Sequence, residues 1–451
     1  MFSKIKSVYS YFQNFLNEIK YFKLNIKRSK ANKAISKLYQ FSNDHLENNK
    51  YIICDGMWDN PHHWLRLAIF LPVLSDFCKA KIMGIYLKDT SVKTLKSLKS
   101  FKFDMYQEID NNPKKIHFEN AKELINLIKS PKEIFNLDLP YGFPGNFFYD
   151  SILKTEMLGN LSIDKNKISK YLAQLICYLE IYEKLINLEK ISAVVLSHPV
   201  NLRFSSLVFI ALKKNLPVYI INYINEYITI RKLESIEEWK ECSHERPKLE
   251  EINAIDDSKN NFLEKVGINY LQKIRKSERG QISILGTFKN DKRNKFNKEK
   301  FLMENKLDKK KLTAVIMTGC WPDFPNVYPK SFYIDYVDWF KKTLNIILDI
   351  EDFNWIIKPH PAEFMYGAKT KSKQFLKHIN KENIISWPKE LSTNNVINIA
   401  DVVVTSHGSA GFEYPAQGIP VIITKKTNYT DWGFTNNCFN YKDYKNLLKN
   451  I

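Results

Sequence analysis

The stretch "ADVVVTSHGSAGFEYPAQGIPVII", residues 400–423, holds a strand, a helix and a second strand in direct succession. Residues 401–407 and 419–424 are apolar, β-branched runs bounded by polar residues, a pattern that favours buried strands. The segment between them, 408–417, predicts a helix that begins among small residues. Two strands joined in this way run parallel, and helices cover both faces of a parallel sheet. The stretch therefore predicts an α/β domain.

The same alternation of strands and helices recurs elsewhere in the chain. In the second half it predicts strands over 312–319, 354–361 and 383–388, and helices over 332–350, 369–380 and 392–400. In the first half it predicts strands over 51–56, 80–87, 191–199 and 216–223, with helices between them. We therefore expect two Rossmann-like αβα domains.

Composition shifts divide the 451 residues into four expected parts. They are a basic amphipathic helical segment over 1–48, a first Rossmann-like domain over 49–230, a charged helical connector over 231–310 and a second Rossmann-like domain over 311–451. The sequence ends soon after the last predicted strand. We expect the second domain to be either a short version of the fold or a truncated one.

The charge balance points to an anionic partner. The chain has 68 Lys+Arg against 49 Asp+Glu, a net charge of +19, which suits a phosphate-bearing substrate or an anionic membrane surface. No pattern of a nucleic-acid-binding module is present, so we expect no nucleic-acid partner.

Residues 1–40 are strongly basic, and their apolar residues recur every three to four positions, which predicts an amphipathic helix. This helix either lies on an anionic membrane surface or packs on its own domain.

The cysteines and the apolar segments indicate a location inside the cell. The six cysteines are scattered without CxxC spacing, which is typical of buried reduced thiols. The sequence has neither the pattern of a signal peptide nor an apolar run of about 20 residues. We expect a cytoplasmic protein, peripheral at the inner face of the cell membrane.

Two strand ends carry the candidate binding residues. In "IIKPHP", residues 356–361, a predicted strand ends in Lys358 and in His360, which is held between two prolines. Prolines fix the backbone, so this histidine is positioned to donate a hydrogen bond to a phosphate. Isolated proline-flanked histidines also occur in ordinary turns.

The second strand end leads into a small-residue helix start. Its residues are Ser406, His407, Gly408, Ser409, Ala410 and Gly411. Free N–H groups at a helix start bind anions, although small residues there also serve tight packing. Glu413 lies one turn further on, where a carboxylate can accept the hydroxyl groups of a ribose. Because ligands of parallel sheets bind at the carboxyl ends of strands, the two strand ends together predict a nucleotide site.

These motifs resemble the donor-binding half of GT-B glycosyltransferases, especially the bacterial capsule and surface-polysaccharide enzymes of the Kdo- or sialyltransferase type. The resemblance covers roughly residues 310–430. It implies that the two domains face a cleft, and that helices usually follow the last strand of the second domain. It implies that His360 contacts the donor phosphate and that Ser406, Ser409 and the 408–411 backbone complete this site. It further implies that Glu413 binds the donor ribose, and that the donor is a nucleotide sugar, with a CMP-activated acidic sugar favoured.

The stretch "CDGMWDNPHHWLRL", residues 54–67, follows the first predicted strand and offers catalytic groups. Transfer with inversion needs a base that deprotonates the acceptor hydroxyl, and Asp55, Asp59 and His63 are the candidates. Asp59 also suits a helix cap before Pro61. His62 is a candidate on the acceptor side. No carboxylate or cysteine spacing completes a metal-ligand set, so we expect no metal and no cofactor.

Arg203, in "SHPVNLRFSS" at the end of a later strand, is a second acceptor-side candidate. It either holds an acidic group or is a surface arginine on the first turn of a helix.

The sequence therefore predicts an inverting, metal-independent GT-B glycosyltransferase with a glycan or glycolipid acceptor. The alternatives are a polyol-phosphate transferase of the teichoic-acid type, a sugar-nucleotide 2-epimerase, and a membrane-surface scaffold without catalysis.

Overall fold

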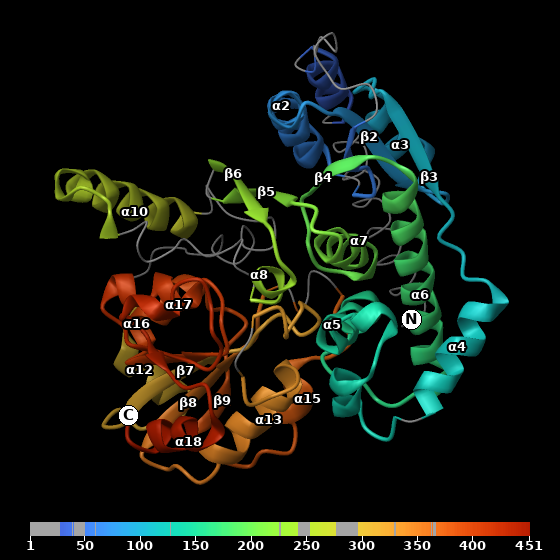
Figure 1. Ribbon diagram of the computed structural model, residues 1–451. Coiled ribbons are helices and arrows are strands. Elements are labelled where there is room, and N and C mark those ends of the chain that lie inside the picture. Colours follow the sequence, from blue (N-terminus) through green and yellow to red (C-terminus); the bar gives the residue numbers. More distant parts are fainter. Residues whose placement is uncertain are drawn as a thin grey trace, which may run out of the picture. The chain divides into compact units, whose positions relative to one another are not determined.

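The computed structural model in Figure 1 contains two six-stranded sheets. It describes residues 28–37, 39, 50–58, 60–126, 128–224, 227–241, 253–276, 296–328, 331–361, 363 and 367–451. Most of the predicted basic helix of residues 1–40 therefore lies outside the described residues, although 28–37 are helical. None of the described helices is both long and apolar enough to cross a membrane.

Packing groups the chain into two compact units, and each unit combines separate segments. The first unit consists of Met1–His117, Ile176–Pro199 and Ser206–Ser235, and the second of Phe118–Leu175, Val200–Ser205 and Ile236–Ile451. The linear domain boundaries given above stay predictions.

The first unit contains a sheet with the strand order β3-β2-β1-β4-β5-β6. Its strands are β1 (Tyr51–Asp55), β2 (Lys81–Leu87), β3 (Met105–Ile109), β4 (Ile191–Leu196), β5 (Val218–Ile224) and β6 (Tyr227–Leu233). All pairs are parallel except β5 with β6, which are antiparallel. The main helices of this part of the chain are α2 (Pro61–Cys78), α3 (Val92–Lys99), α4 (Lys115–Asn126), α6 (Lys165–Leu188) and α7 (Leu202–Lys213).

The second unit contains a fully parallel sheet with the order β12-β11-β10-β7-β8-β9. Its strands are β7 (Leu312–Met317), β8 (Phe353–Lys358), β9 (Ile384–Ser386), β10 (Val402–Thr405), β11 (Val421–Ile423) and β12 (Asn436–Asn437). Its α-helices include α5 (Gly145–Glu156), α8 (Ile236–Lys240), α10 (Asn260–Arg275), α12 (Lys298–Glu304), α13 (Tyr336–Ile347), α15 (Ser372–Leu376), α16 (Val396–Ile399), α17 (Ala410–Glu413) and α18 (Tyr441–Lys449).

Burial on both faces explains why the central strands of the second sheet have apolar residues at consecutive positions. Ala314 and Ile316 of β7 belong to one core cluster, whereas Val315 belongs to the cluster on the opposite side. A strand buried on both faces needs apolar residues at consecutive positions. The prediction of two Rossmann-like α/β units is confirmed, while the cleft between them stays a prediction.

Several elements differ from the predictions. The strands β3 and β6 were not predicted. The helix expected over 408–417 is shorter, because α17 ends at Glu413 and a 3-10 turn, Pro415–Gln417, follows it. Pro415 has no N–H for an α-helical hydrogen bond, and Gly418 then ends the turn with φ +79°. The helix expected over 369–380 is likewise reduced to α15.

Candidate functional site

The carboxyl edge of the second sheet collects the polar residues that follow four neighbouring strands. Met317 pairs with both Lys358 and Thr405, and Thr405 pairs with Ile423, so β8, β7, β10 and β11 end at the same level. The strand order reverses between β7 and β10, and ligands of open parallel sheets bind where this reversal occurs. The structure therefore brings the two predicted strand-end motifs to one edge of one sheet.

His360 is fixed at this edge through its backbone. Its N–H donates to the hydroxyl oxygen of Thr318, the residue after β7, over 3.0 Å. Burial and the nearby charge of Lys358 lower the pKa of His360 to about 4, although Asp323 acts in the opposite direction. The imidazole is therefore neutral at neutral pH, with one ring N–H able to donate to an anion.

Lys358 is a buried cation that lacks hydrogen-bond and ion-pair partners among the described residues. Its side chain is 3% exposed, and its ammonium lies 5.7 Å from the centre of the Trp387 ring. Burial lowers its pKa to about 8, and the charge of Glu413 opposes this decrease. Within the described residues, no hydrogen bond or ion pair of this ammonium is found. A buried charge without a partner is costly, so a bound anion would stabilise it.

His407 is held by neutral groups around its ring. The Tyr336 hydroxyl lies 3.1 Å from Nε2, and the Ser406 hydroxyl lies 3.1 Å from Nδ1. The Tyr336 ring stacks on the imidazole with 5.2 Å between centroids. Burial lowers the pKa of His407 to about 4, with further lowering by Lys425 and His360. Because Ser406 is fully buried and bonded to this ring, it orients the imidazole.

The glycines at the start of α17 have different physical roles. Gly408 has φ +107° and would have no atom within 4 Å of a Cβ, so it faces open space in a conformation that suits glycine. A Cβ on Gly411 would lie 2.1 Å from the Tyr429 hydroxyl oxygen, so its small size serves packing. The N–H groups of Gly408, Ser409 and Ala410 donate to no described residue, and they remain available to a ligand.

Glu413 lies partly buried in a mixed electrostatic environment. Burial raises its pKa, whereas a hydrogen bond with Ser409 and the charges of Arg275 and Lys358 lower it. Arg275 is the last residue of α10, in the charged connector that the sequence did not single out. The carboxylate is therefore close to cations from two separate elements.

The first sheet has a different group at its corresponding edge. Its strand order reverses between β1 and β4. Asp55 ends β1 and accepts a hydrogen bond from the N–H of Met57 over 2.6 Å. Its other carboxylate oxygen lies 3.9 Å from Nε2 of His63, and both side chains are fully buried. Burial lowers the pKa of His63 to about 3, with further lowering by Arg66 and His198.

Aromatic contacts cover this buried pair. The Trp58 ring lies 5.3 Å from the His63 ring and 4.6 Å from the His198 ring, measured between centroids. His198 follows β4 and is exposed. It is thus a titratable group that this edge presents to solvent beside the buried pair, and it was not among the sequence-based candidates.

The structure describes the remaining site residues predicted from the sequence in less detail. Asp59 lies outside the described residues, and of His62 only the position near the start of α2 is described. Arg203, on the first turn of α7, packs its guanidinium 4.6 Å from the ring of Phe204. Its segment, Val200–Ser205, belongs to the second unit. Among the described side chains, no group of three or more His, Cys, Asp or Glu is arranged to hold a metal.

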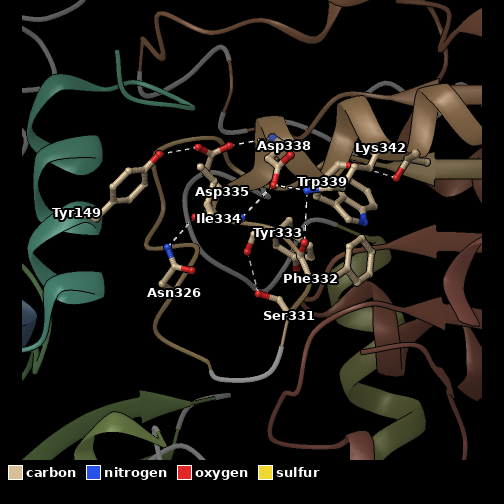
Figure 2. A network of polar contacts seen from close by, with 11 residues as sticks. Tyr149, Asn326, Ser331, Phe332, Tyr333, Ile334, Asp335, Asp338, Trp339 and Lys342 are labelled. Atoms are coloured by element: carbon tan, nitrogen blue, oxygen red, sulfur yellow. Dashed lines mark hydrogen bonds and ion pairs between the residues drawn. The ribbon is translucent and has the colours of Figure 1, made fainter. Parts of the chain in front are cut away.

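The loop between β7 and α13 is attached to α5. The Tyr149 hydroxyl donates to Asp335 over 2.6 Å, as Figure 2 shows. The carboxylate of Asp150 accepts hydrogen bonds from the backbone N–H and the side-chain amide of Asn326, which also donates to the carbonyl of Ile334. Two consecutive residues of α5 thus fix the loop that leads into α13, whose first residue, Tyr336, stacks on His407.

Comparison with known proteins gives structural likeness only. No family model and no curated protein matches the chain. Similar solved structures include a KpsC beta Kdo 2,4 transferase from Thermosulfurimonas dismutans, with 14% identity, coverage of 56% of this chain and 75% of that chain, and a TM-score of 0.36. Another is the UDP-GlcNAc 2-epimerase from Neisseria meningitidis bound to UDP-GlcNAc, with 11% identity, coverage of 88% and 90%, and a TM-score of 0.26. Both TM-scores are below about 0.5, so the function is inferred from the site.

Proposed function

We propose that the protein is a glycosyltransferase that binds a nucleotide sugar at the carboxyl edge of the second sheet. The observation that carries this proposal is the buried ammonium of Lys358, which lacks an anionic partner among the described residues. It lies at the strand-order reversal, beside the neutral imidazole of His360 and near the unused N–H groups of 408–410. A phosphate group satisfies all three kinds of donor.

The same groups suit the departure of a nucleotide. When the bond between sugar and phosphate breaks, negative charge accumulates on the phosphate oxygens. Donors that are already in position stabilise this charge without reorganisation. In the proposed site, His360 donates a ring N–H, Lys358 supplies a positive charge and the start of α17 supplies backbone N–H groups. No metal enters this proposal.

The finer features of the donor follow from the resemblance of the sequence motifs. Glu413 is proposed to accept hydrogen bonds from the ribose hydroxyls, with Ser409 beside it. The favoured donor is a CMP-activated acidic sugar, and the acceptor is a surface polysaccharide or a lipid-linked glycan. Arg203 and His62 stay proposed contacts of the acceptor.

The first unit is proposed to supply the base for an inverting transfer. Asp55 and His63 form a buried pair at the end of β1, in which the imidazole is neutral and can accept a proton. Both side chains are fully buried, so the pair must become accessible before an acceptor hydroxyl reaches it. Asp59 remains a second proposed base.

Nucleotide binding tests the first step of this proposal. Calorimetric titration with CMP, CDP and UDP is expected to show saturable binding of at least one of them. His360→Ala is expected to weaken that binding about 10-fold, the effect of losing a hydrogen bond to a charged group. His378→Ala, at an exposed histidine, serves as the control. The proposal fails if the wild type binds no nucleotide or if His360→Ala binds it unchanged.

Product analysis separates the related activities. A glycosidic bond supports glycosyl transfer, a phosphodiester supports a polyol-phosphate transferase, and an isomerised nucleotide sugar supports a 2-epimerase. A scaffold without catalysis gives none of these products and binds no nucleotide.

A cytoplasmic, peripheral membrane location is also proposed, with residues 1–40 as the contact with anionic lipids. Ile35 is fully buried in the core of the first unit, so removal of all forty residues would also remove core packing. Deletion of residues 1–27 is the sharper test. It is expected to abolish sedimentation with anionic liposomes; undiminished sedimentation excludes this role.

A further inference from the structure

Lys425 is a second buried cation at the carboxyl edge of the second sheet. It follows β11, its side chain is 1% exposed, and its ammonium lies 5.3 Å from the centre of the Tyr333 ring. The ammonium donates to the hydroxyl of Ser331 at the long distance of 3.4 Å. An ammonium has three N–H donors, so this single contact leaves it with an incomplete set of partners among the described residues.

The neighbouring carboxylates do not form a direct ion pair with Lys425. Asp150, which is 1% exposed, uses its two oxygens to accept hydrogen bonds from Asn326 over 2.6 and 2.8 Å. Asp335 accepts from Tyr149 and from the N–H of Asp338. Both acids are therefore held by other groups, although Asp150 interacts electrostatically with Lys425.

Lys425 and Lys358 each act electrostatically on a different histidine of this edge. The charge of Lys425 contributes to the lowered pKa of His407, whereas Lys358 contributes to that of His360. In the sheet, β10 and β7 separate β11 from β8, which places the two lysine-bearing strands about 14 Å apart at the usual strand spacing. The two cations thus flank the point where the strand order reverses.

We propose that Lys425 binds a phosphate oxygen of the nucleotide donor from the side opposite Lys358. This inference rests on the proposed function, because it adds a residue to the same site. The carboxylate of Asp150, fixed by Asn326, favours the charged form of Lys425 while no phosphate is bound. When phosphate binds, it completes the hydrogen bonds of the ammonium.

Substitution of Lys425, with its neighbour as a matched control, tests the proposal. Lys425→Met is expected to weaken CMP or UDP binding at least about 10-fold in calorimetry, because a hydrogen bond between charged groups is lost. Lys425→Arg, which keeps the charge, is expected to retain most of the affinity. Lys426→Met is the control, since Lys426 is partly exposed and pairs with Asp431 at 3.7 Å. Unchanged binding by Lys425→Met overturns the proposal.

The pH dependence of Asp150→Asn provides a second readout that also applies if Lys425→Met fails to fold. Burial lowers the pKa of Lys425 to about 8, and Asp150 opposes this decrease. Among the described residues, the titratable groups that interact with Lys425 include Asp150 on α5, His407 after β10 and Tyr333, and Asp335, before α13, interacts in turn with Asp150. Without Asp150, Lys425 loses its proton at lower pH, so nucleotide affinity is expected to fall at lower pH than in the wild type.

An identical pH profile in wild type and Asp150→Asn contradicts the proposed role of Lys425. Nucleotide binding by the wild type distinguishes failure of this inference from failure of the proposed function. If the wild type binds no nucleotide, the proposed function fails; if it binds nucleotide and the Lys425 variants do not differ from it, only this inference fails.

Discussion

The carboxyl edges of the two sheets have the same topology but different chemistry. In each sheet the strand order reverses beside the first strand, between β1 and β4 or between β7 and β10. The second edge carries Lys358 and Lys425, two buried cations without direct carboxylate partners among the described residues. The first edge carries Asp55 and His63, a buried carboxylate and a neutral imidazole that face each other. Topology places a potential binding position in both units, and the charges distinguish the proposed anion site from the proposed proton-accepting pair.

The two edges share one electrostatic feature, which is that their histidines are neutral. Burial is the main cause in both, lowering the pKa of His63 to about 3 and that of His360 to about 4. In the second unit, the buried lysines lower the histidine pKa values further. A neutral histidine beside a lysine donates a hydrogen bond to phosphate without adding a second charge that must be buried.

The largest effect is expected for a substitution at the edge of the first sheet, which should change turnover but not nucleotide affinity. Asp55→Asn keeps an oxygen for the N–H of Met57 but removes the negative charge beside His63. Turnover is expected to fall about 10²–10⁴-fold, the usual effect of losing acid–base catalysis, whereas nucleotide affinity stays unchanged. Steady-state kinetics and calorimetry measure the two quantities, with Asp89→Asn at an exposed position as the control. Turnover equal to that of the wild type would mean that Asp55 has only a structural role.

The second prediction removes a cation from the other edge. Lys358→Met is expected to weaken nucleotide binding about 10- to 100-fold, because hydrogen bonds between charged groups contribute about 1.5–3 kcal/mol. Calorimetry with the nucleotide that the wild type binds measures the change. Lys389→Met, at an exposed lysine, should behave like the wild type. If Lys358→Met and Lys389→Met bind the nucleotide equally well, the charge of Lys358 does not contribute to binding, and the two edges do not differ in this respect.

The third prediction concerns the packing beneath the second edge. Gly411→Ala is expected to lower the free energy of unfolding by about 1–3 kcal/mol, because the added methyl group overlaps the Tyr429 hydroxyl. Gly267→Ala in α10 meets no atom within 4 Å, and it should stabilise the protein by about 0.5–1 kcal/mol through helix propensity. Denaturant titration measures both variants. If Gly411→Ala is as stable as the wild type, the tight contact with Tyr429 does not exist in solution.

The smallest expected effect is a pH dependence at the second edge alone. Lysine binds phosphate in its protonated form, so affinity is expected to fall several-fold as pH rises through about 8, the lowered pKa of Lys358. Lys358→Arg should reduce this fall, since arginine keeps its proton throughout the range. Calorimetry between about pH 7 and about pH 10 measures it. A flat profile in the wild type would mean that the lysines do not contact the ligand.

The sequence predicted most strands of the second unit because their residues are buried on both faces. Consecutive residues at the centres of β7 and β10, 314–316 and 402–404, alternate between the two cores, so the apolar pattern is strong. The shorter elements were predicted poorly. The helix after β10 stops at Glu413 because Pro415 cannot continue it. The strand β6 forms through its antiparallel pairing with β5, and the sequence of β6 alone does not indicate this pairing.

The candidate binding residues at 358–361 and 406–411 were visible in the sequence because they directly follow recognisable strands. Lys425 follows a predicted strand as well, and the same reasoning applied to β11 would have found it. Asp150 and Arg275 gave no comparable signal. They come from α5 and α10, far from the strand ends in sequence, and only packing brings them near the site.

The sequence by itself determined the parallel α/β pattern and the strand ends that carry His360 and His407, because periodicity and strand-end position are local properties. Only the tertiary structure decided which strands are neighbours and therefore which side chains share an edge. It also decided that Gly408 faces open space whereas Gly411 packs against Tyr429. Burial, which sets the pKa values of the lysines and histidines, arises from segments distant in the chain. It is therefore a property of the folded protein.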